Sequence, residues 1–200
     1  STLVRNRSID EHGHQGPTRV VYNGVDGNRF HPNGKRDEDD FVFVGGTTRR
    51  KGYDRLLEAV TGTDIQITIV GAEDPISVPV PPNVELVGYV NHADLRPFYQ
   101  NARALVHPAV YEPFGNVVLE SLACGTPVIV SDDRFCGAAE ICTDDVGKTI
   151  DPRDPEELRK TLGSFEPSRY DVADCRSLAR TYTWERVATE TIEFARTLCP

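Results

Sequence analysis

The sequence predicts an α/β fold in which a parallel sheet carries helices on both faces. Two observations predict it. Short apolar runs such as residues 41–44 alternate with amphipathic segments such as residues 53–60 through most of the 200 residues, and most runs end at a glycine or another turn residue. Because residues 41–44 are apolar throughout, both faces of that strand should be covered, and the alternation of apolar strands and helices with short links favours parallel strands. We therefore predict a Rossmann-like domain.

The predicted elements follow one another along the chain. Strands are expected at residues 41–44, 65–71, 84–88, 104–107, 127–131 and 147–150. Helices are expected at residues 53–60, 93–101, 115–124 and 155–162. Gly125 is a typical helix stop, and Asp154 is a typical N-cap ahead of Pro155. A short strand at residues 20–22 precedes this series and ends at the Asn23-Gly24 turn. Ligands of such sheets bind beyond the carboxyl ends of the strands, so the loops at those ends are the ones to examine.

The two ends of the chain differ from its central part, residues 20–182. The first forty residues, which include residues 1–19 ahead of the central part, look loosely built, because Gly13, Gly16 and Pro17 interrupt any regular pattern. Residues 183–200 instead predict a long amphipathic helix, whose apolar side chains recur at helical spacing. The members of this stripe are Trp184, Val187, Ala188, Thr191, Ile192, Ala195 and Leu198. The stripe has to cover either the central domain or a domain that this chain lacks.

Composition restricts the partners and the compartment. Lys and Arg number 22 and Asp and Glu number 31, which leaves a formal net charge of −9. This acidity disfavours a nucleic acid polymer as partner but is compatible with a small phosphorylated ligand. Five cysteines without a CxxC pair indicate reduced thiols in a cytoplasmic setting and argue against a zinc site. No stretch reaches the ~20 apolar residues of a membrane span, and the start carries no secretory signal. The absence of methionine suggests a piece of a larger protein.

The segment from Gly45 to Gly52 is the first candidate for binding chemistry. Its glycines would let backbone N–H groups approach a ligand, and the helix that follows presents its N-terminus to an anion. Three cations, Arg49, Arg50 and Lys51, stand at the same end. The segment suggests a diphosphate site that includes Gly46, although a glycine turn with solvated basic residues would look the same. The fingerprints GxGxxG and GxxxxGKS or GxxxxGKT are absent, which disfavours standard dinucleotide and P-loop sites.

The nine residues from Glu112 to Glu120 form the second candidate. Glu112 lies in the loop after a predicted strand, and Glu120 lies on the apolar helix that follows. Burying a carboxylate there is costly unless hydrogen-bond donors reach it, and sugar or ribose hydroxyls are such donors. Gly115 and Asn116 would direct free N–H groups into the same space. Alternatively, Glu120 lies on a solvated edge or is satisfied by serine or backbone groups.

Three further positions carry weaker signals. His107 ends a predicted strand, where it would touch a ligand or serve as a satisfied structural histidine. Glu140 follows the fifth strand and is either a ligand contact or an ordinary acid at a helix start. The sequence Asp37-Glu38-Asp39 matches a DxD metal pattern, but only inside a longer acidic run. We therefore assign no metal site.

Several motifs in order resemble those of the group 1 glycosyltransferases, also called family 4, which have the GT-B architecture. The resemblance runs from about residue 20 to the end of the chain. It is carried by Asn23-Gly24-Val25-Asp26 with Phe30 and Pro32, Phe43-Val44-Gly45 with Arg50-Lys51-Gly52, Glu112 to Glu120 as an E-x7-E motif, Ala123 to Val128, and Trp184-Glu185-Arg186. Each motif is weak alone, whereas their common order is specific.

The resemblance implies that this chain is one GT-B half. Family members have two Rossmann-like domains with the active site between them, and the C-terminal domain holds the nucleotide-sugar donor. Residues 1–19 would be a hinge remnant, and the acceptor-binding N-terminal domain would be missing. The expected reaction is transfer of a hexose from a UDP- or GDP-sugar with retention of configuration, with no cofactor and no catalytic metal. The chain alone would be inactive, and any contact with the inner face of the membrane would come through the missing half.

The resemblance also implies a role for each candidate residue. Lys51 would bind the donor phosphates and Glu120 the ribose diol. Glu112 would face the donor sugar, with the backbone of the next residues beside it, and the segment after the third strand would meet the base. The remaining members of this donor site are Gly45, Gly46, Arg50, Gly88, Tyr89, Val90, Phe114, Gly115 and Asn116.

One departure from the family and two alternatives stay open. The family often carries Arg five residues before the phosphate-loop Lys, and Gly46 occupies that place here. Either Arg49 or Arg50 would then supply the charge. Sugar-nucleotide epimerases share the architecture, but are expected to lack the string from Glu112 to Glu120 in this form. A non-catalytic α/β ligand-binding module would show no preference for a nucleotide.

Overall fold

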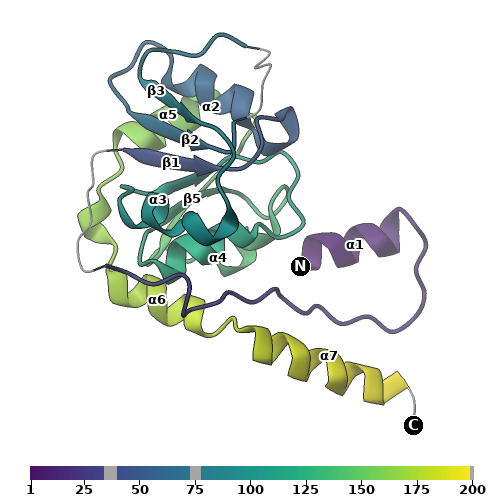
Figure 1. Ribbon diagram of the computed structural model, residues 1–200. Helices are drawn as coiled ribbons and strands as arrows, with labels where there is room; N and C mark the ends of the chain where they lie inside the picture. Colours follow the sequence, from purple (N-terminus) through teal and green to yellow (C-terminus); the bar gives the residue numbers. More distant parts are fainter. Residues whose placement is uncertain (34–39, 73–77, 199–200) are drawn as a thin grey trace.

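The computed structural model describes residues 1–33, 40–72 and 78–198. Its centre is a six-stranded sheet in the order β3-β2-β1-β4-β5-β6 (Figure 1). The strands are β1 (Phe41–Val44), β2 (Ile67–Val70), β3 (Val84–Val87), β4 (Leu105–His107), β5 (Val128–Ser131) and β6 (Gly147–Ile150). All paired strands are parallel. The strand order reverses between β1 and β4, which makes the space beyond their carboxyl ends the switch point where such sheets bind ligands.

Both faces of the sheet are buried. Strand β1 buries all four side chains, because Phe41 and Phe43 point into one core and Val42 and Val44 into the other. Helices α2 (Tyr53–Val60) and α5 (Pro155–Gly163) cover the first face. Helices α3 (Arg96–Gln100), α4 (Asn116–Ala123) and α6 (Val172–Arg180) cover the second. The predicted parallel sheet with helices on both faces is therefore confirmed.

Two local predictions were wrong. The expected helix at residues 93–101 is a 3-10 turn, η2 (His92–Asp94), followed by the short helix α3, in whose first turn Pro97 lies. Proline lacks the N–H that an interior position needs, so the helix has to begin beside it. Residues 20–22 form no strand. Instead, the Tyr22 ring packs against Phe114 and Tyr182, whose carbonyl accepts a bond from Val25 N at 2.9 Å.

Two helices escaped the sequence analysis. Helix α1 (Thr2–Asp10) has no buried residue, so no apolar period reveals it. Its N-terminus is held from elsewhere, since the Glu140 carboxylate accepts bonds from Thr2 N and Leu3 N at 3.2 and 3.3 Å. Helix α6 buries only the small side chains Cys175 and Ala179, and these give a weak pattern. The other short elements are η1 (Arg49–Lys51), η3 (Gly137–Ile141) and η4 (Pro167–Arg169).

The predicted terminal helix is present as α7 (Trp184–Leu198). Figure 1 shows α7 extending away from the layers around the sheet, with α1 and the segment after it beside the same end of the molecule. None of its residues is buried, and Trp184 and Ile192 are each about half exposed, at 49% and 51%. In the described part of the chain, no helix is long and apolar enough to cross a membrane.

Candidate functional site

The loop after β1 is built around a close contact with the loop after β4. Gly45 continues the sheet by donating from its N–H to Val70 O at 2.9 Å, and η1 follows with its three cations. Gly52 ends η1 in the left-handed region, at φ 75°. A Cβ on this residue would lie 1.8 Å from the Pro108 carbonyl oxygen, so only glycine fits. Val110 N also donates to Arg50 O at 3.0 Å. These contacts bring the cations of η1 beside the loop that carries Glu112.

Glu112 is held by its backbone and contacted by a cation. Its N–H donates to Phe135 O at 2.8 Å, and its carbonyl accepts from Gly137 N at 3.0 Å. Its side chain is only 11% exposed, and the Lys51 ammonium contacts its Oε2 directly. Arg50 lies further out, with Nη1 4.0 Å from the same oxygen and hydrogen-bonded to Tyr111 O at 3.1 Å. The structure therefore brings Lys51, Glu112 and Arg50 together at the switch point.

The charge state of this cluster follows from its contacts. Burial opposes ionisation of Glu112, but the His107 imidazole and the Lys51 ammonium outweigh it and lower the pKa of the carboxyl to about 2. His107 is fully buried, and its Nε2 lies 3.7 Å from Glu112 Oε2, too far for a hydrogen bond. Burial lowers the pKa of this histidine below its ordinary value. Glu112 is thus a carboxylate at neutral pH, and His107 is a neutral imidazole.

The N-terminus of α4 forms another wall of this corner. Gly115 precedes the helix in the left-handed region, at φ 92°. A Cβ there would lie 3.3 Å from Glu112 Cγ and 3.4 Å from His107 Nε2, so the glycine leaves room for both groups. The first N–H groups of a helix have no partner within the helix and favour an anion. Phe114 is buried just before the helix, and the Asn116 side chain accepts a bond from Asn23 Nδ2 at 2.7 Å.

Glu120 lies on α4 and is buried, so the structural alternative to ligand binding fits in neither of its two forms. It is not on a solvated edge, and its partners are neither serine nor backbone. The Tyr99 hydroxyl donates to Oε2 at 2.7 Å, and His92 Nε2 lies 2.8 Å from Oε1. Sequence reasoning missed Tyr99 and His92, because neither stands near Glu120 in sequence and no motif joins them.

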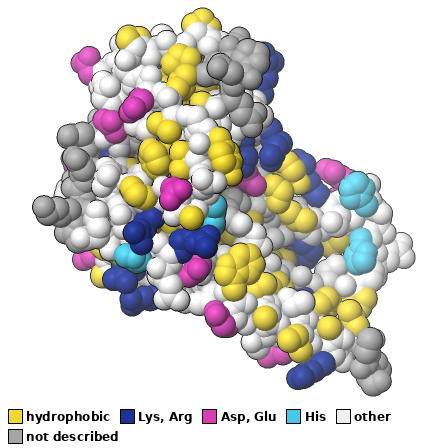
Figure 2. Space-filling model, in the orientation of Figure 1, with side chains coloured by type: hydrophobic (Ala, Val, Ile, Leu, Met, Phe, Trp, Pro, Cys, Tyr) yellow, Lys and Arg dark blue, Asp and Glu magenta, His cyan; other side chains and the backbone are white. Residues whose placement is uncertain are grey.

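A groove opens beside Glu120. It has a volume of about 750 Å³ and is lined by Asn116, Glu120 and His92, by residues 24–30, and by the junction of α6 and α7. Figure 2 shows basic, acidic and histidine side chains close together in the middle of the face over α3 and α4. The groove is therefore polar and charged, and large enough for a small ligand.

The segment after β3 lies at the same edge of the sheet. Gly71 N donates to Gly88 O at 3.2 Å, and a Cβ on Gly71 would lie 3.1 Å from Gly45 O, so the Gly88 and Gly45 loops are neighbours. Tyr89 is 85% exposed, while Val90 packs against the second core. The segment after β3 therefore begins next to the loop after β1. No hydrogen bond or ion pair among the described residues joins Tyr89 or Val90 to Lys51.

Glu140 has a different place. Its carboxylate accepts the Tyr22 hydroxyl at 2.6 Å in addition to the two N–H groups of α1. Burial opposes its ionisation, but these donors prevail and lower the pKa of the carboxyl. Glu140 therefore caps α1. The sequence Asp37-Glu38-Asp39 lies outside the described residues.

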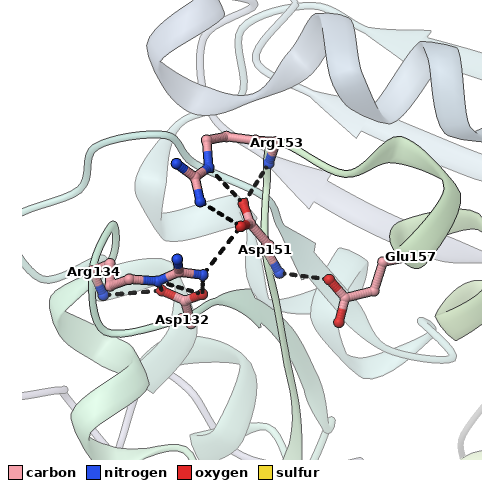
Figure 3. Close-up of polar contacts among 5 residues, drawn as sticks. All are labelled: Asp132, Arg134, Asp151, Arg153 and Glu157. Atoms are coloured by element: carbon pink, nitrogen blue, oxygen red, sulfur yellow. Dashed lines mark hydrogen bonds and ion pairs between the residues drawn. The ribbon is translucent and has the colours of Figure 1, made fainter.

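A second charged cluster lies beyond β5 and β6 (Figure 3). Asp132 accepts from Arg134 Nε at 3.0 Å, and Arg134 Nη2 also reaches Asp151 at 3.1 Å. Arg153 Nη2 donates to Asp151 at 2.7 Å. The two guanidinium groups lie against the Phe135 ring, at 5.2 and 4.9 Å from its centroid. The network thus packs around Phe135, whose backbone carbonyl accepts the hydrogen bond from Glu112 N. It was not foreseen, because its partners follow different strands.

The described residues contain no group of three His, Cys, Asp or Glu side chains placed to hold a metal ion. Cys124, Cys136, Cys142 and Cys175 form no disulfide among the described residues, and the fifth cysteine lies outside the described ranges.

The fold and this edge of the sheet define a class of protein: a Rossmann-like α/β domain whose switch point carries a cationic loop and a helix N-terminus. Residues 24–181 match the model of the family described as glycosyl transferases group 1, and the chain belongs to that family. The resemblance inferred from the motifs is thereby confirmed.

Individual relatives agree with this assignment. The uncharacterized glycosyltransferase MJ1607 of Methanocaldococcus jannaschii is 29% identical over 206 residues, covering 87% of this chain and 52% of that protein. The GDP-mannose-dependent alpha-(1-6)-phosphatidylinositol dimannoside mannosyltransferase of Mycobacterium tuberculosis is 30% identical over 161 residues, covering 74% and 41%. The structure of sucrose-phosphate synthase from Thermosynechococcus elongatus has a TM-score of 0.83 at 25% identity, covering 99% and 57%. The chain spans about half the length of the curated relatives it matches.

Proposed function

We propose that this chain is the donor-binding half of a retaining glycosyltransferase that uses a UDP- or GDP-hexose. The observation that carries the proposal is the convergence of Lys51, Glu112 and the N-terminus of α4 at the switch point. A cation beside a helix N-terminus suits a diphosphate, and an ionised carboxylate nearby suits sugar hydroxyls. The M. tuberculosis relative is described as dependent on GDP-mannose, which supports a nucleotide-sugar donor.

Each neighbouring group has a proposed contact with that donor. Lys51 and Arg50 bind the diphosphate with the backbone of Gly45 and Gly46, and Arg50 supplies the charge that the family often places at position 46. The backbone of Phe114, Gly115 and Asn116 faces the same phosphates, and Glu112 faces the sugar. In this proposal Glu120 accepts ribose hydroxyls with oxygen lone pairs that Tyr99 and His92 leave free. The residues Gly88, Tyr89 and Val90 border the base.

The chemistry proposed for these groups is electrostatic. Breaking the bond between the sugar and the diphosphate leaves negative charge on the phosphate oxygens and positive charge on the sugar ring. Lys51 and the N–H groups of α4 stabilise the first charge, and the carboxylate of Glu112 stabilises the second. Catalysis would then need no metal and no cofactor.

We also propose that the acceptor binds to a domain outside this chain. The chain spans about half the length of its relatives, and the exposed apolar side chains of α7 lack a cover among the described residues. On this proposal residues 1–19 are a hinge remnant, residues 20–182 the donor domain, and residues 183–200 a helix that meets the absent domain. The enzyme would work in the cytoplasm, with any contact to the inner face of the membrane made by the absent half.

Calorimetric titration with UDP, GDP, ADP and their sugar conjugates tests the donor site. We expect one nucleotide to bind preferentially, and Lys51→Ala to weaken it by about 10–100-fold through loss of a charge-assisted contact. Lys148→Ala is the matched control, because this lysine pairs with Asp144 on the surface. Equal losses in both variants, or no preference for a nucleotide, would contradict the proposal. Sugar transfer to simple acceptors by this chain alone would contradict the half-enzyme part.

A further inference from the structure

His107 is buried without a hydrogen bond to its ring. It is 0% exposed, and neither Nδ1 nor Nε2 has a hydrogen-bond partner among the described residues. Buried polar side chains are nearly always paired, and leaving one unpaired costs about 1–3 kcal/mol. A structural histidine would be expected to have a partner. The unpaired ring therefore calls for a state of the protein in which a partner is present.

The candidate partner is the Glu112 carboxylate. Its Oε2 lies 3.7 Å from His107 Nε2, and the same oxygen is held from the other side by Lys51. No side chain stands between the ring and the carboxylate at Gly115, where a Cβ would crowd both of them. A shift of Oε2 by roughly 1 Å would bring the two atoms to hydrogen-bond distance.

We propose that His107 is a positioning residue that takes over the Glu112 carboxylate when the phosphates of the donor engage Lys51. This inference rests on the proposed function, since the donor has to compete for the lysine. Without a second partner, Glu112 would become a buried carboxylate that has lost its cation, which is strongly unfavourable. His107 supplies that partner through Nε2–H and holds the carboxylate toward the sugar.

The exchange has a consequence for protons. The charged groups that act on the ring are Glu112, which raises the pKa of His107, and Lys51 and Arg50, which lower it together with burial. The thiol of Cys136, next to the backbone contact of Glu112, stays neutral because burial raises its pKa to about 12. When phosphates neutralise Lys51 and Arg50, Glu112 is released from the lysine. Its carboxylate is then the main charged neighbour of the His107 ring. Ligand binding should then raise the proton affinity of His107.

Titration of the His107 ring by NMR tests the exchange without a ligand. Lys51→Met should raise the pKa of His107 by about 1, because the ring and Glu112 then pair. The double variant Lys51→Met/Glu112→Gln should cancel most of that rise. An equal rise in both variants would mean that only the charge of the lysine matters, and would overturn the inference.

Calorimetry with inorganic pyrophosphate and with UDP or GDP, in two buffers of different ionisation enthalpy near pH 6.5, tests the liganded state. On binding the ligand, the parent protein should take up a fraction of a proton more than the His107→Asn variant does. Comparing the two proteins cancels the protons that the ligand itself binds or releases. Equal proton uptake would overturn the exchange. Absence of binding to every ligand would instead overturn the proposed function, and the NMR experiment would still decide whether Glu112 is the alternative partner of His107.

Discussion

Two charged clusters lie at the carboxyl ends of the strands of the same sheet, and they differ in burial and in hydrogen bonding. The cluster at the switch point, Lys51, Glu112 and His107, follows β1 and β4, and its carboxylate side chain is only 11% exposed. The cluster beyond β5 and β6, Asp132, Arg134, Asp151 and Arg153, carries arginine side chains that are 56% exposed. Both join cations to carboxylates.

The difference lies in which groups are satisfied. In the outer cluster each carboxylate accepts bonds from guanidinium groups, and the backbone N–H of Asp151 also reaches Glu157 at 3.0 Å (Figure 3). In the inner cluster one ammonium and one carboxylate meet, and a buried imidazole lies 3.7 Å from that carboxylate, beyond hydrogen-bond distance. Exposed ion pairs contribute little to stability, whereas buried groups without partners are costly. A buried imidazole without a hydrogen-bond partner at the switch point therefore suggests that a bound ligand changes the contacts of this cluster.

The largest effect is expected from disturbing the close approach of two loops that builds the inner cluster. Gly52→Ala places a Cβ 1.8 Å from Pro108 O and requires a positive φ. We expect a loss of at least about 3 kcal/mol in the free energy of unfolding. Gly62→Ala is the control, because its φ of 73° is similar and nothing lies within 4 Å of its Cβ. It should lose only about 1 kcal/mol. Urea denaturation of both variants decides the matter, and similar losses would show that the contact with Pro108 is unimportant.

The pH dependence of the free energy of unfolding should also distinguish the two clusters, with a smaller effect than Gly52→Ala. The pKa of Glu112 is lowered to about 2 in the folded protein, against burial, by His107 and Lys51. Its stabilisation is therefore complete above about pH 4.5, the ordinary value, and is lost as the pH falls toward 2. Allowing for partial solvent screening, we expect about 1–2 kcal/mol to disappear over that range, and Glu112→Gln to flatten the loss.

The outer cluster supplies the control for that experiment. Arg153 beside Asp151 lowers the pKa of this carboxyl as well, but both groups are at the surface. Asp151→Asn should leave the pH dependence of unfolding nearly unchanged. If Asp151→Asn flattened the curve as much as Glu112→Gln, burial would not distinguish the clusters.

The smallest effect is expected from the outer arginines. Arg134→Ala and Arg153→Ala each remove a guanidinium group that is more than half exposed. We expect each melting temperature to stay within about 1 °C of the parent value. Nucleotide affinity should be unchanged within about twofold, since neither side chain belongs to the inner cluster. Differential scanning calorimetry and the nucleotide titration measure both. A large loss of affinity would show that the outer network positions Glu112 through Phe135.

Local patterns carried much of the fold. The run at β1 is apolar throughout and the run at β5 is apolar up to Ser131, because both sheet faces are covered, and Asp154 and Gly125 stand where helix ends need them. These signals operate within a few residues, so they can be read along the chain. Helix α1 left no such signal, because its stability comes from Glu140, far away in sequence.

The six sheet strands in order, the family and the candidate groups of the inner cluster could be read from the sequence, since each depends on residues that are close together in the chain. Which of these groups meet depends on the fold. It put Lys51 on Glu112, gave Glu120 the partners Tyr99 and His92, and buried His107 without one. Burial and pairing depend on how distant loops approach one another across the end of the sheet, and no local pattern records that distance.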